Sequence, residues 1–200
     1  LSGENGIVDL RTGELRRGRP EDRITMIANV KYDPEADCSR WDKFIDEVFE
    51  SDKELIAFVQ KALGYSLTGS EKSQAAFFCY GSGANGKSVL FKTIKNILGD
   101  YAWDAPASLF EKNSQATNTN DVAATERVRF LVSSENLTTS RLHEQRIKAW
   151  TGGDTVTARF LNREFFRFEP TAKPWLFFNH KPQVSDDSNG FWRRIRLIPF

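Results

Sequence analysis

The sequence predicts an α/β fold built on a central parallel sheet. Short apolar runs of strand length recur along the chain, separated by longer segments. The clearest example is 75–98, where an apolar run, a glycine-rich loop and an amphipathic helical segment follow one another. Runs that are apolar at nearly every position are typical of parallel strands buried on both faces.

Residues 1–66 are expected to form an N-terminal segment, and 67–200 the domain that contains the sheet. Two short apolar pieces at 5–15 are joined by turn residues and predict a small β-hairpin. A further strand is expected over 24–30. This part of the chain shows no catalytic chemistry.

A helical hairpin is predicted over 41–64, because apolar side chains recur on one face of each half. We expect the second helix to begin at a capping box formed by Ser51 and Glu54. An aromatic stripe at helical spacing is typical of core packing rather than of a ligand site.

The loop at 81–88 matches the phosphate-binding pattern of glycine, four residues, glycine, lysine and serine or threonine. Its residues are Gly81, Ser82, Gly83, Ala84, Asn85, Gly86, Lys87 and Ser88. In such a loop, backbone N–H groups and a helix N-terminus enclose a polyphosphate. We expect Lys87 to reach the β- and γ-phosphates of ATP, and the Ser88 hydroxyl to ligate Mg²⁺. A chance glycine-rich turn is the alternative, and the flanking strand and helix argue against it.

A second buried strand is predicted over 128–134, after a long polar loop at 104–121. Glu135 follows this strand directly. Ligands of parallel α/β sheets bind beside the carboxyl ends of the strands. We therefore expect Glu135 to orient or deprotonate the attacking water and to share the Mg²⁺ site with Ser88. A surface glutamate without a role is the alternative.

A third buried strand is predicted over 174–178. Asn179 stands at its end, where an amide can bind the γ-phosphate or the attacking water. A last strand is expected over 195–200, directly after Arg193 and Arg194. These two arginines are candidates for the cation that stabilises charge on the transferred phosphoryl group.

Residues 155–169 predict a second β-hairpin, in which Asn162 can adopt a left-handed conformation at the tip. Arg159 and Arg163 interleave with phenylalanines, a composition suited to the phosphates and bases of single-stranded DNA. Lys148, which precedes a Gly-Gly turn, is expected to be a further DNA contact. The alternative is an ordinary half-buried hairpin with solvated arginines.

Charge is distributed unevenly along the chain. The net charge is +1, but residues 138–200 hold 11 Lys and Arg against 6 Asp and Glu, a local charge of +5. Such an asymmetry is compatible with a polyanionic partner. The two cysteines, Cys38 and Cys79, lie far apart and argue for a reducing compartment. No apolar run reaches membrane-spanning length and there is no signal-peptide pattern, so we expect a cytoplasmic protein without a membrane partner.

Together, and in this order, these pieces resemble the superfamily-3 helicase domain of phage and plasmid primase-helicases, with poxvirus-type helicases as relatives. The segments that resemble its motifs are 81–88 for motif A, 130–135 for motif B, 148–154 and the following hairpin for motif B′, 175–179 for motif C and 192–194 for the arginine-finger region. The resemblance covers nearly the whole chain, including the N-terminal segment. Ser134 departs from it, because many relatives have a second acid there, and this leaves open which groups complete the metal shell.

The resemblance implies a P-loop NTPase with an AAA+-like three-layer fold that assembles as a hexameric ring around single-stranded DNA. It implies ATP hydrolysis with Mg²⁺ at subunit interfaces, with Asn179 as sensor. Arg194 is favoured over Arg193 as the finger that enters the neighbouring site. The expected protein is thus a DNA helicase motor of phage or plasmid replication in a bacterial host cell, and the chain is expected to be a piece of it.

Two alternatives remain open. One is an ATP-dependent clamp or origin-binding switch that does not translocate. The other is a small-molecule kinase, which would have no use for an arginine-bearing hairpin before the sensor strand.

Overall fold

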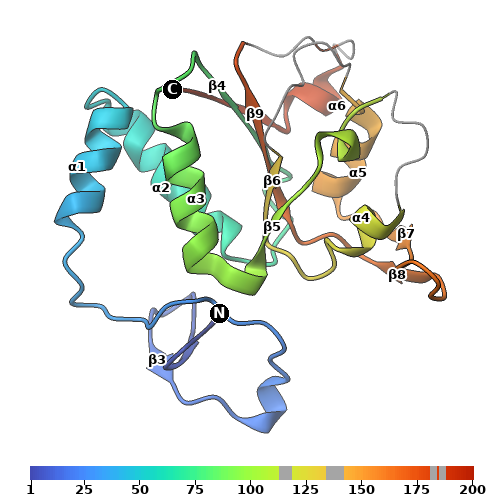
Figure 1. Cartoon of the computed structure of the whole chain (residues 1–200), viewed down its shortest axis with the longest axis horizontal. Helices are drawn as coiled ribbons and strands as arrows, with labels where there is room; N and C mark the ends of the chain where they lie inside the picture. Colours follow the sequence, from blue (N-terminus) through green and yellow to red (C-terminus); the bar gives the residue numbers. More distant parts are fainter. Residues whose placement is uncertain (113–118, 134–141, 181–183, 185–187) are drawn as a thin grey trace.

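The computed structural model describes residues 1–112, 119–133, 142–180, 184 and 188–200. Its centre is a five-stranded sheet in the order β10-β4-β9-β6-β5, and all neighbouring strands are parallel (Figure 1). The strands are β4 (Ala76–Tyr80), β5 (Ala102–Asp104), β6 (Phe130–Ser133), β9 (Lys173–Phe178) and β10 (Ile195–Pro199). The predicted α/β fold with a central parallel sheet is confirmed.

Helices cover both faces of the sheet, which gives three layers (Figure 1). On one face lie α1 (Ser39–Val48), α2 (Lys53–Ser66) and α3 (Lys87–Leu98). On the other lie α4 (Thr119–Ala123), α5 (Glu144–Gly152) and α6 (Asn189–Trp192). Because successive side chains of a strand point to opposite faces, Phe77 packs in the first core and Phe78 in the second.

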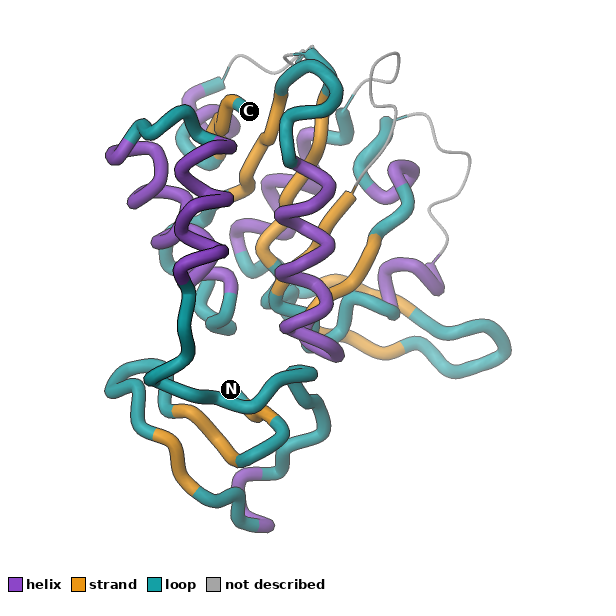
Figure 2. Tube along the Cα trace, turned by 60° about the vertical axis from the view of Figure 1, so that its left-hand side comes forward, coloured by secondary structure: helices purple, strands orange, loops and turns teal. Residues whose placement is uncertain are grey.

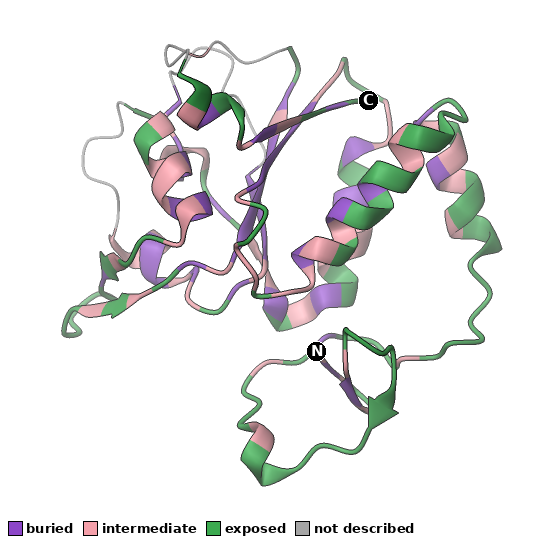
Figure 3. Cartoon of the chain, turned by 180° about the vertical axis from the view of Figure 1, so that it is seen from behind, coloured by how far each residue is buried: buried purple, intermediate pink, exposed green. Residues whose placement is uncertain are grey.

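Aromatic rings fill the first core. The ring of Trp175 in β9 stacks on Phe77 of β4, with centroids 4.2 Å apart, and lies 5.6 Å from the ring of Phe130 in β6. Its indole N–H donates to the Ser66 hydroxyl at the end of α2 (3.0 Å), so α2 is joined to the middle of the sheet. Figure 3 shows the resulting burial along the central strands.

The N-terminal residues form a small antiparallel sheet of β1 (Ser2–Gly3), β2 (Gly6–Val8) and β3 (Leu15–Arg16), set apart from the central sheet (Figure 2). The predicted hairpin is thus confirmed. The strand expected over 24–30 is wrong, because backbone groups there bond singly to different segments. Ala28 N–H donates to Ser2 O (2.8 Å), and Asn29 N–H to Ile97 O of α3 (2.9 Å).

The helical hairpin is confirmed, but its predicted cap is wrong by one residue. Asp52 is the N-cap of α2, and its carboxylate accepts from the N–H groups of Glu54 (3.1 Å) and Leu55 (3.0 Å). The Ser51 hydroxyl donates instead to Asp46 (2.7 Å). A carboxylate at this position also gains from the helix dipole, which a hydroxyl does not.

The long loop expected over 104–121 is wrong in part. The edge strand β5 reaches residue 104, a 3-10 turn spans Ala107–Leu109, and α4 begins at residue 119. Leu109 and Phe110 are 1% and 0% exposed, so their burial in the second core holds this segment in place. Residues 113–118 lie outside the described part of the chain.

The predicted second hairpin is confirmed as β7 (Val156–Ala158) and β8 (Phe166–Phe168), which pair antiparallel. Asn162 at the tip has φ of 58°, the left-handed conformation expected of it. The hairpin extends away from the body of the molecule beside α4 (Figure 1).

A buried ion pair, which the sequence did not predict, ties the segment after α2 to β9. Lys173 is 0% exposed, and its ammonium donates to Glu71 (2.9 Å), Thr68 O (2.9 Å) and Thr171 O (2.7 Å). Its three N–H donors are therefore all satisfied. Burial lowers the pKa of Lys173, while desolvation raises the pKa of Glu71 to about 7 in spite of the lysine.

Replacement of Lys173 by methionine is expected to lower the free energy of unfolding by about 3–5 kcal/mol, because it leaves a buried carboxylate and two carbonyls without their donor. Chemical denaturation of the variant checks this. Lys61→Met, at an exposed position of α2, is the control and should change stability by less than about 0.5 kcal/mol. Equal effects at the two positions would contradict the role given to the buried pair.

Candidate functional site: the loop between β4 and α3

The glycine-rich loop leaves β4 at Tyr80 and enters α3 at Lys87. A Cβ atom on Gly81 would lie 2.2 Å from the carbonyl oxygen of Phe200, so only glycine fits there. Gly86, the N-cap of α3, has φ of 84°, and a Cβ there would lie 2.5 Å from the Val48 side chain. The two fixed glycines are thus required by close approaches from β10 and α1.

Lys87 lies in the first turn of α3 and is 8% exposed. Its ammonium donates to Gly81 O across the loop (2.7 Å) and lies 5.7 Å from the centroid of the Phe200 ring. Burial lowers the pKa of Lys87, because desolvation penalises the charged ammonium. The ammonium of Lys87 therefore reaches back across the loop to its first residue and has a single backbone acceptor among the described residues.

Two polar atoms in this region are buried without a hydrogen-bond partner in the described structure. They are Nδ2 of Asn85, inside the loop, and Oγ of Ser133, the last residue of β6. An unpaired buried polar group is costly, so such atoms are typical of sites that a ligand or water completes. Sequence reasoning included Asn85 as part of the loop, without a role for its side chain, and missed Ser133, which lies within an apolar run.

The order of the strands brings the ends of β4, β9 and β6 to one edge of the sheet. Tyr80 pairs with Phe178, and Ser133 with Leu176. Asn179, which is exposed, follows β9 directly, and β9 lies between β4, which leads into the glycine-rich loop, and β6. Ser88 is exposed on the first turn of α3. Glu135 and Ser134 lie outside the described residues, so their side chains are not placed.

Arg193 and Arg194 lie at the opposite edge of the sheet from Lys87. Ala76 N–H, at the start of β4, donates to Arg194 O (2.9 Å), and β4 spans four residue steps from there to the loop, or roughly 13 Å. The guanidinium of Arg194 donates to Gly190 O, and its Nε is buried without a partner among the described residues. Arg193 is exposed.

The β7–β8 hairpin presents arginines and apolar side chains together. The guanidinium of Arg159 lies 4.6 Å from the centroid of the Phe165 ring, and Arg163 is exposed at the tip. Leu161 and Phe165 are 80% and 58% exposed. Lys148 lies elsewhere, on α5, where its ammonium donates to the hydroxyl of Ser188 at the N-cap of α6 (3.1 Å).

No three His, Cys, Asp or Glu side chains gather in the described part of the chain in a way that could hold a metal ion. The helices that the structure describes include none with the length and apolar character needed to cross a membrane.

Two family descriptions match the chain. Residues 1–50 match "D5 N terminal like", and residues 79–194 match "Family of unknown function (DUF5906)". The second match spans more than half of the chain and contains the loop, β6, the hairpin and β9.

Curated relatives come from large DNA viruses. "Putative helicase L207/L206" of Acanthamoeba polyphaga mimivirus is 32% identical over 203 residues, which cover 98% of this chain and 21% of that protein. "Putative helicase 121R" of Invertebrate iridescent virus 3 is 26% identical over 100% of this chain and 22% of the protein. "Putative primase C962R" of African swine fever virus (isolate Tick/Malawi/Lil 20-1/1983) is 26% identical over 96% and 21%.

The chain thus spans about a fifth of the length of these relatives. Their viral sources give no support to the expected phage or plasmid origin in a bacterial cell. A solved structure, the A form apo structure of "NrS-1 C terminal region-CTR(305-718)", superposes with a TM-score of 0.62 at 17% identity. It covers 86% of this chain and 38% of that one, and it shares the fold.

Gly81→Ala is expected to destabilise the protein by about 1–3 kcal/mol and to abolish nucleotide binding, because its methyl group must displace the backbone of Phe200. Gly83→Ala in the same loop is the matched control, since a Cβ there meets nothing within 4 Å. Thermal unfolding with and without ATP measures both effects. The steric argument is wrong if the two variants behave alike.

Proposed function

The chain belongs to the family described as "Family of unknown function (DUF5906)" and to the D5-like primase-helicases of large DNA viruses, and from this we propose that it is an ATP-driven DNA helicase motor domain. It has a P-loop, AAA+-like fold, hydrolyses ATP at interfaces of a hexameric ring, and translocates on single-stranded DNA. The observation that carries the proposal is the loop at 81–88, with a buried lysine at its middle, at the sheet edge where β4, β6 and β9 end.

The glycine cradle fits a polyphosphate. Lys87 exchanges Gly81 O for the β- and γ-phosphate oxygens, which offer a charged acceptor in place of a neutral one. Asn85 Nδ2, unpaired and buried beside Gly81, can donate to the same phosphates. Each change replaces a poor or absent partner with a charged one, so phosphate binding is favoured at this loop.

Residues at the ends of the neighbouring strands supply the remaining chemistry. Glu135 accepts the proton of the attacking water, and the Asn179 amide orients that water or the γ-phosphate. Ser88 and Glu135 are the residues that would hold Mg²⁺, and the bound ion would neutralise charge on the phosphates. The hydroxyl of Ser133, buried without a partner among the described residues at the end of β6, is a further candidate to hydrogen-bond a water there.

Among the residues that the structure describes, we assign no cation to the far side of the γ-phosphate, and we give this role to an arginine of the adjacent subunit. Arg193 and Arg194 lie too far from their own loop to serve it. The sequence favours Arg194 as the finger. The guanidinium of Arg194 donates to Gly190 O of the same subunit, whereas Arg193 is exposed. We therefore assign the finger to Arg193 and a positioning role to Arg194.

DNA contacts are assigned to the hairpin. Arg163 binds phosphate, while Arg159 and Phe165 form a cation–aromatic pair on which a base can stack. Lys148 is a weaker candidate, since it donates to Ser188. A DNA clamp or origin-binding switch would use the same contacts without unwinding, and strand displacement on a fork substrate separates the two functions.

Glu135→Gln should bind ATP as well as the wild type and lose DNA-stimulated turnover by at least about 10²-fold, because an amide cannot act as a base. Lys87→Ala should lose both binding and turnover. Equilibrium binding of a fluorescent ATP analogue and phosphate release, measured on the assembled protein, test these outcomes. The control Glu14→Gln, at an exposed acid just before β3, should leave ATP binding and turnover unchanged. Wild-type turnover in Glu135→Gln would require another base.

A mixture of Lys87→Ala and Arg193→Ala subunits should recover part of the turnover that each variant lacks alone. The Lys87→Ala subunit has an inactive nucleotide site but an intact finger, and the Arg193→Ala subunit has an intact site but no finger. A finger supplied by the neighbouring subunit is worth about 10³–10⁵ in rate. Phosphate release by the mixed assembly is the measurement. A mixture of Lys87→Ala with the Lys87→Ala/Arg193→Ala double variant is the control without recovery. No recovery in rings shown to be mixed would place the arginine's action within its own subunit.

A further inference from the structure

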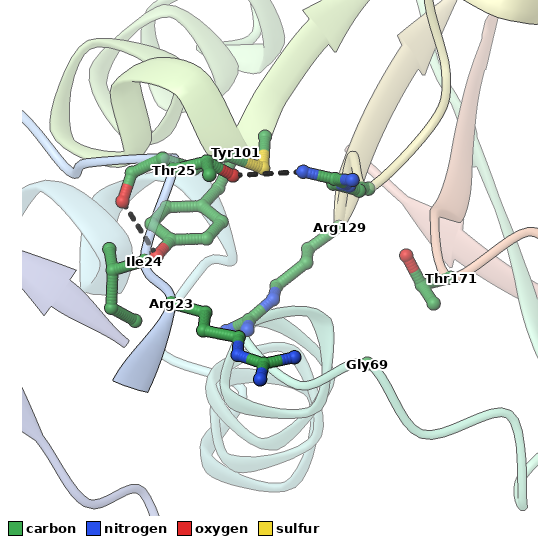
Figure 4. Close-up of a pocket in the computed structure, with 9 residues that line it drawn as sticks. Arg23, Ile24, Thr25, Gly69, Tyr101, Arg129 and Thr171 are labelled. Carbon is green, nitrogen blue, oxygen red and sulfur yellow. Dashed lines mark hydrogen bonds between the residues drawn. The ribbon is translucent and has the colours of Figure 1, made fainter. Parts of the chain in front are cut away.

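A basic cavity of about 380 Å³ lies between the part of the chain before α1, which we call the N-terminal module, and the domain that carries the sheet. We call it the junction pocket. Five parts of the chain line it: residues 23–26 before α1, Gly69 after α2, Tyr101 before β5, Arg127 and Arg129 before β6, and Thr171 before β9. Figure 4 shows the side chains of Arg23, from the segment before α1, and Arg129, from just before β6, entering the cavity. The volume is within the range of ligand-binding clefts.

The junction pocket holds three guanidinium groups and no lining carboxylate. Arg23 is exposed, and its side chain makes no hydrogen bond or ion pair within the described residues. Arg127 donates to the Thr25 hydroxyl (3.0 Å) and has one neighbouring acid, Glu126, at 3.6 Å. The pocket therefore carries a net positive charge that the described residues do not neutralise.

Arg129 is held by two contacts of its guanidinium group. It donates to Leu67 O (2.6 Å), and its guanidinium lies 4.6 Å from the centroid of the Tyr101 ring. Burial lowers the pKa of Arg129, because desolvation penalises the charged guanidinium. The Tyr101 hydroxyl is itself occupied, since it donates to Met26 O (3.0 Å).

The remaining polar groups of the pocket suit phosphate better than a base. The Thr25 hydroxyl accepts from Arg127 and the Thr171 hydroxyl donates to Val128 O, so both are already engaged by the protein. Tyr101 is 3% exposed and offers no free ring face for stacking. Guanidinium groups bind phosphate oxygens in a bidentate way, and such contacts carry no sequence information.

The position of the pocket points to nucleic acid as the source of the phosphate. It lies at the sheet edge opposite the P-loop, where β6 and β9 begin. The hairpin is joined to it directly, because Thr171 follows the last residue of β8, Phe168, by three residues. Residues 169–171 therefore connect the end of the hairpin to the pocket.

We propose that the junction pocket binds a backbone phosphate of single-stranded DNA, as a second contact beyond the β7–β8 hairpin. This inference rests on the proposed function for the identity of the polymer, but not for the existence of an anion site. The N-terminal module then does more than precede the motor, because Arg23 and Thr25 complete the site from its side.

The test is the salt dependence of oligothymidylate binding, measured by fluorescence anisotropy on the full-length protein. Arg23→Gln should weaken binding and lower the slope of log K against log salt by about 0.7, the value for one lost phosphate contact on a single strand. Arg17→Gln, an exposed arginine of the same module outside the pocket, should leave both unchanged. Arg127→Gln repeats the test from the other wall, with circular dichroism to verify folding.

Arg163→Ala separates this proposal from the proposed function. If that variant lowers the slope while Arg23→Gln and Arg127→Gln bind like Arg17→Gln, the junction pocket proposal is overturned and the hairpin assignment stands. A wild-type protein that binds no single-stranded DNA overturns both.

A free polyphosphate is the other source of the same chemistry. Thermal unfolding with inorganic pyrophosphate, in the Lys87→Ala background so that the P-loop does not compete, distinguishes it. Stabilisation that Arg23→Gln removes, together with an unchanged DNA salt slope, would overturn the assignment to nucleic acid.

Discussion

The insertion of β9 between β4 and β6 is the constraint on which the rest of the structure depends. Parallel pairing sets Tyr80 beside Phe178 and Ser133 beside Leu176, so three strands end at one edge. The stacked rings of Phe77 and Trp175 and the buried ammonium of Lys173 stabilise this arrangement at the middle and at the start of β9. If β9 were displaced, the loop after β4 and Asn179 would no longer face the same space.

The candidate functional residues fall into two groups, one at each end of the parallel strands. Lys87, Asn85 and Asn179 lie at the carboxyl edge, where glycine is required for close approach. The arginines before β10 and the junction pocket lie at the other edge. The loop at 81–88 and the arginines before β10 thus lie apart within one subunit, as the proposed active site shared between neighbouring subunits would require.

Local patterns predicted the fold because each buried strand is a continuous apolar run and the loop has a fixed spacing. The failures involve contacts between distant residues. The segment over 24–30 has strand-like composition, but its N–H groups bond to Ser2, Ile97 and Asp100 in turn. Lys173 looked like an ordinary charge before a strand, since Glu71 is about a hundred residues away. The unpaired amide of Asn85 and the junction pocket depend on tertiary packing that no local spacing encodes.

The contact between Gly81 and Phe200 has a consequence for communication. β10 begins two residues after Arg193 and ends one residue before Phe200, whose carbonyl oxygen is packed against the loop. Under the proposed function, this short, hydrogen-bonded strand connects a subunit's own nucleotide site to the arginine that it would offer to its neighbour. Any coupling through this strand is reciprocal by thermodynamic linkage, so engagement of the arginine must change the affinity of the donating subunit for its own nucleotide by the same factor.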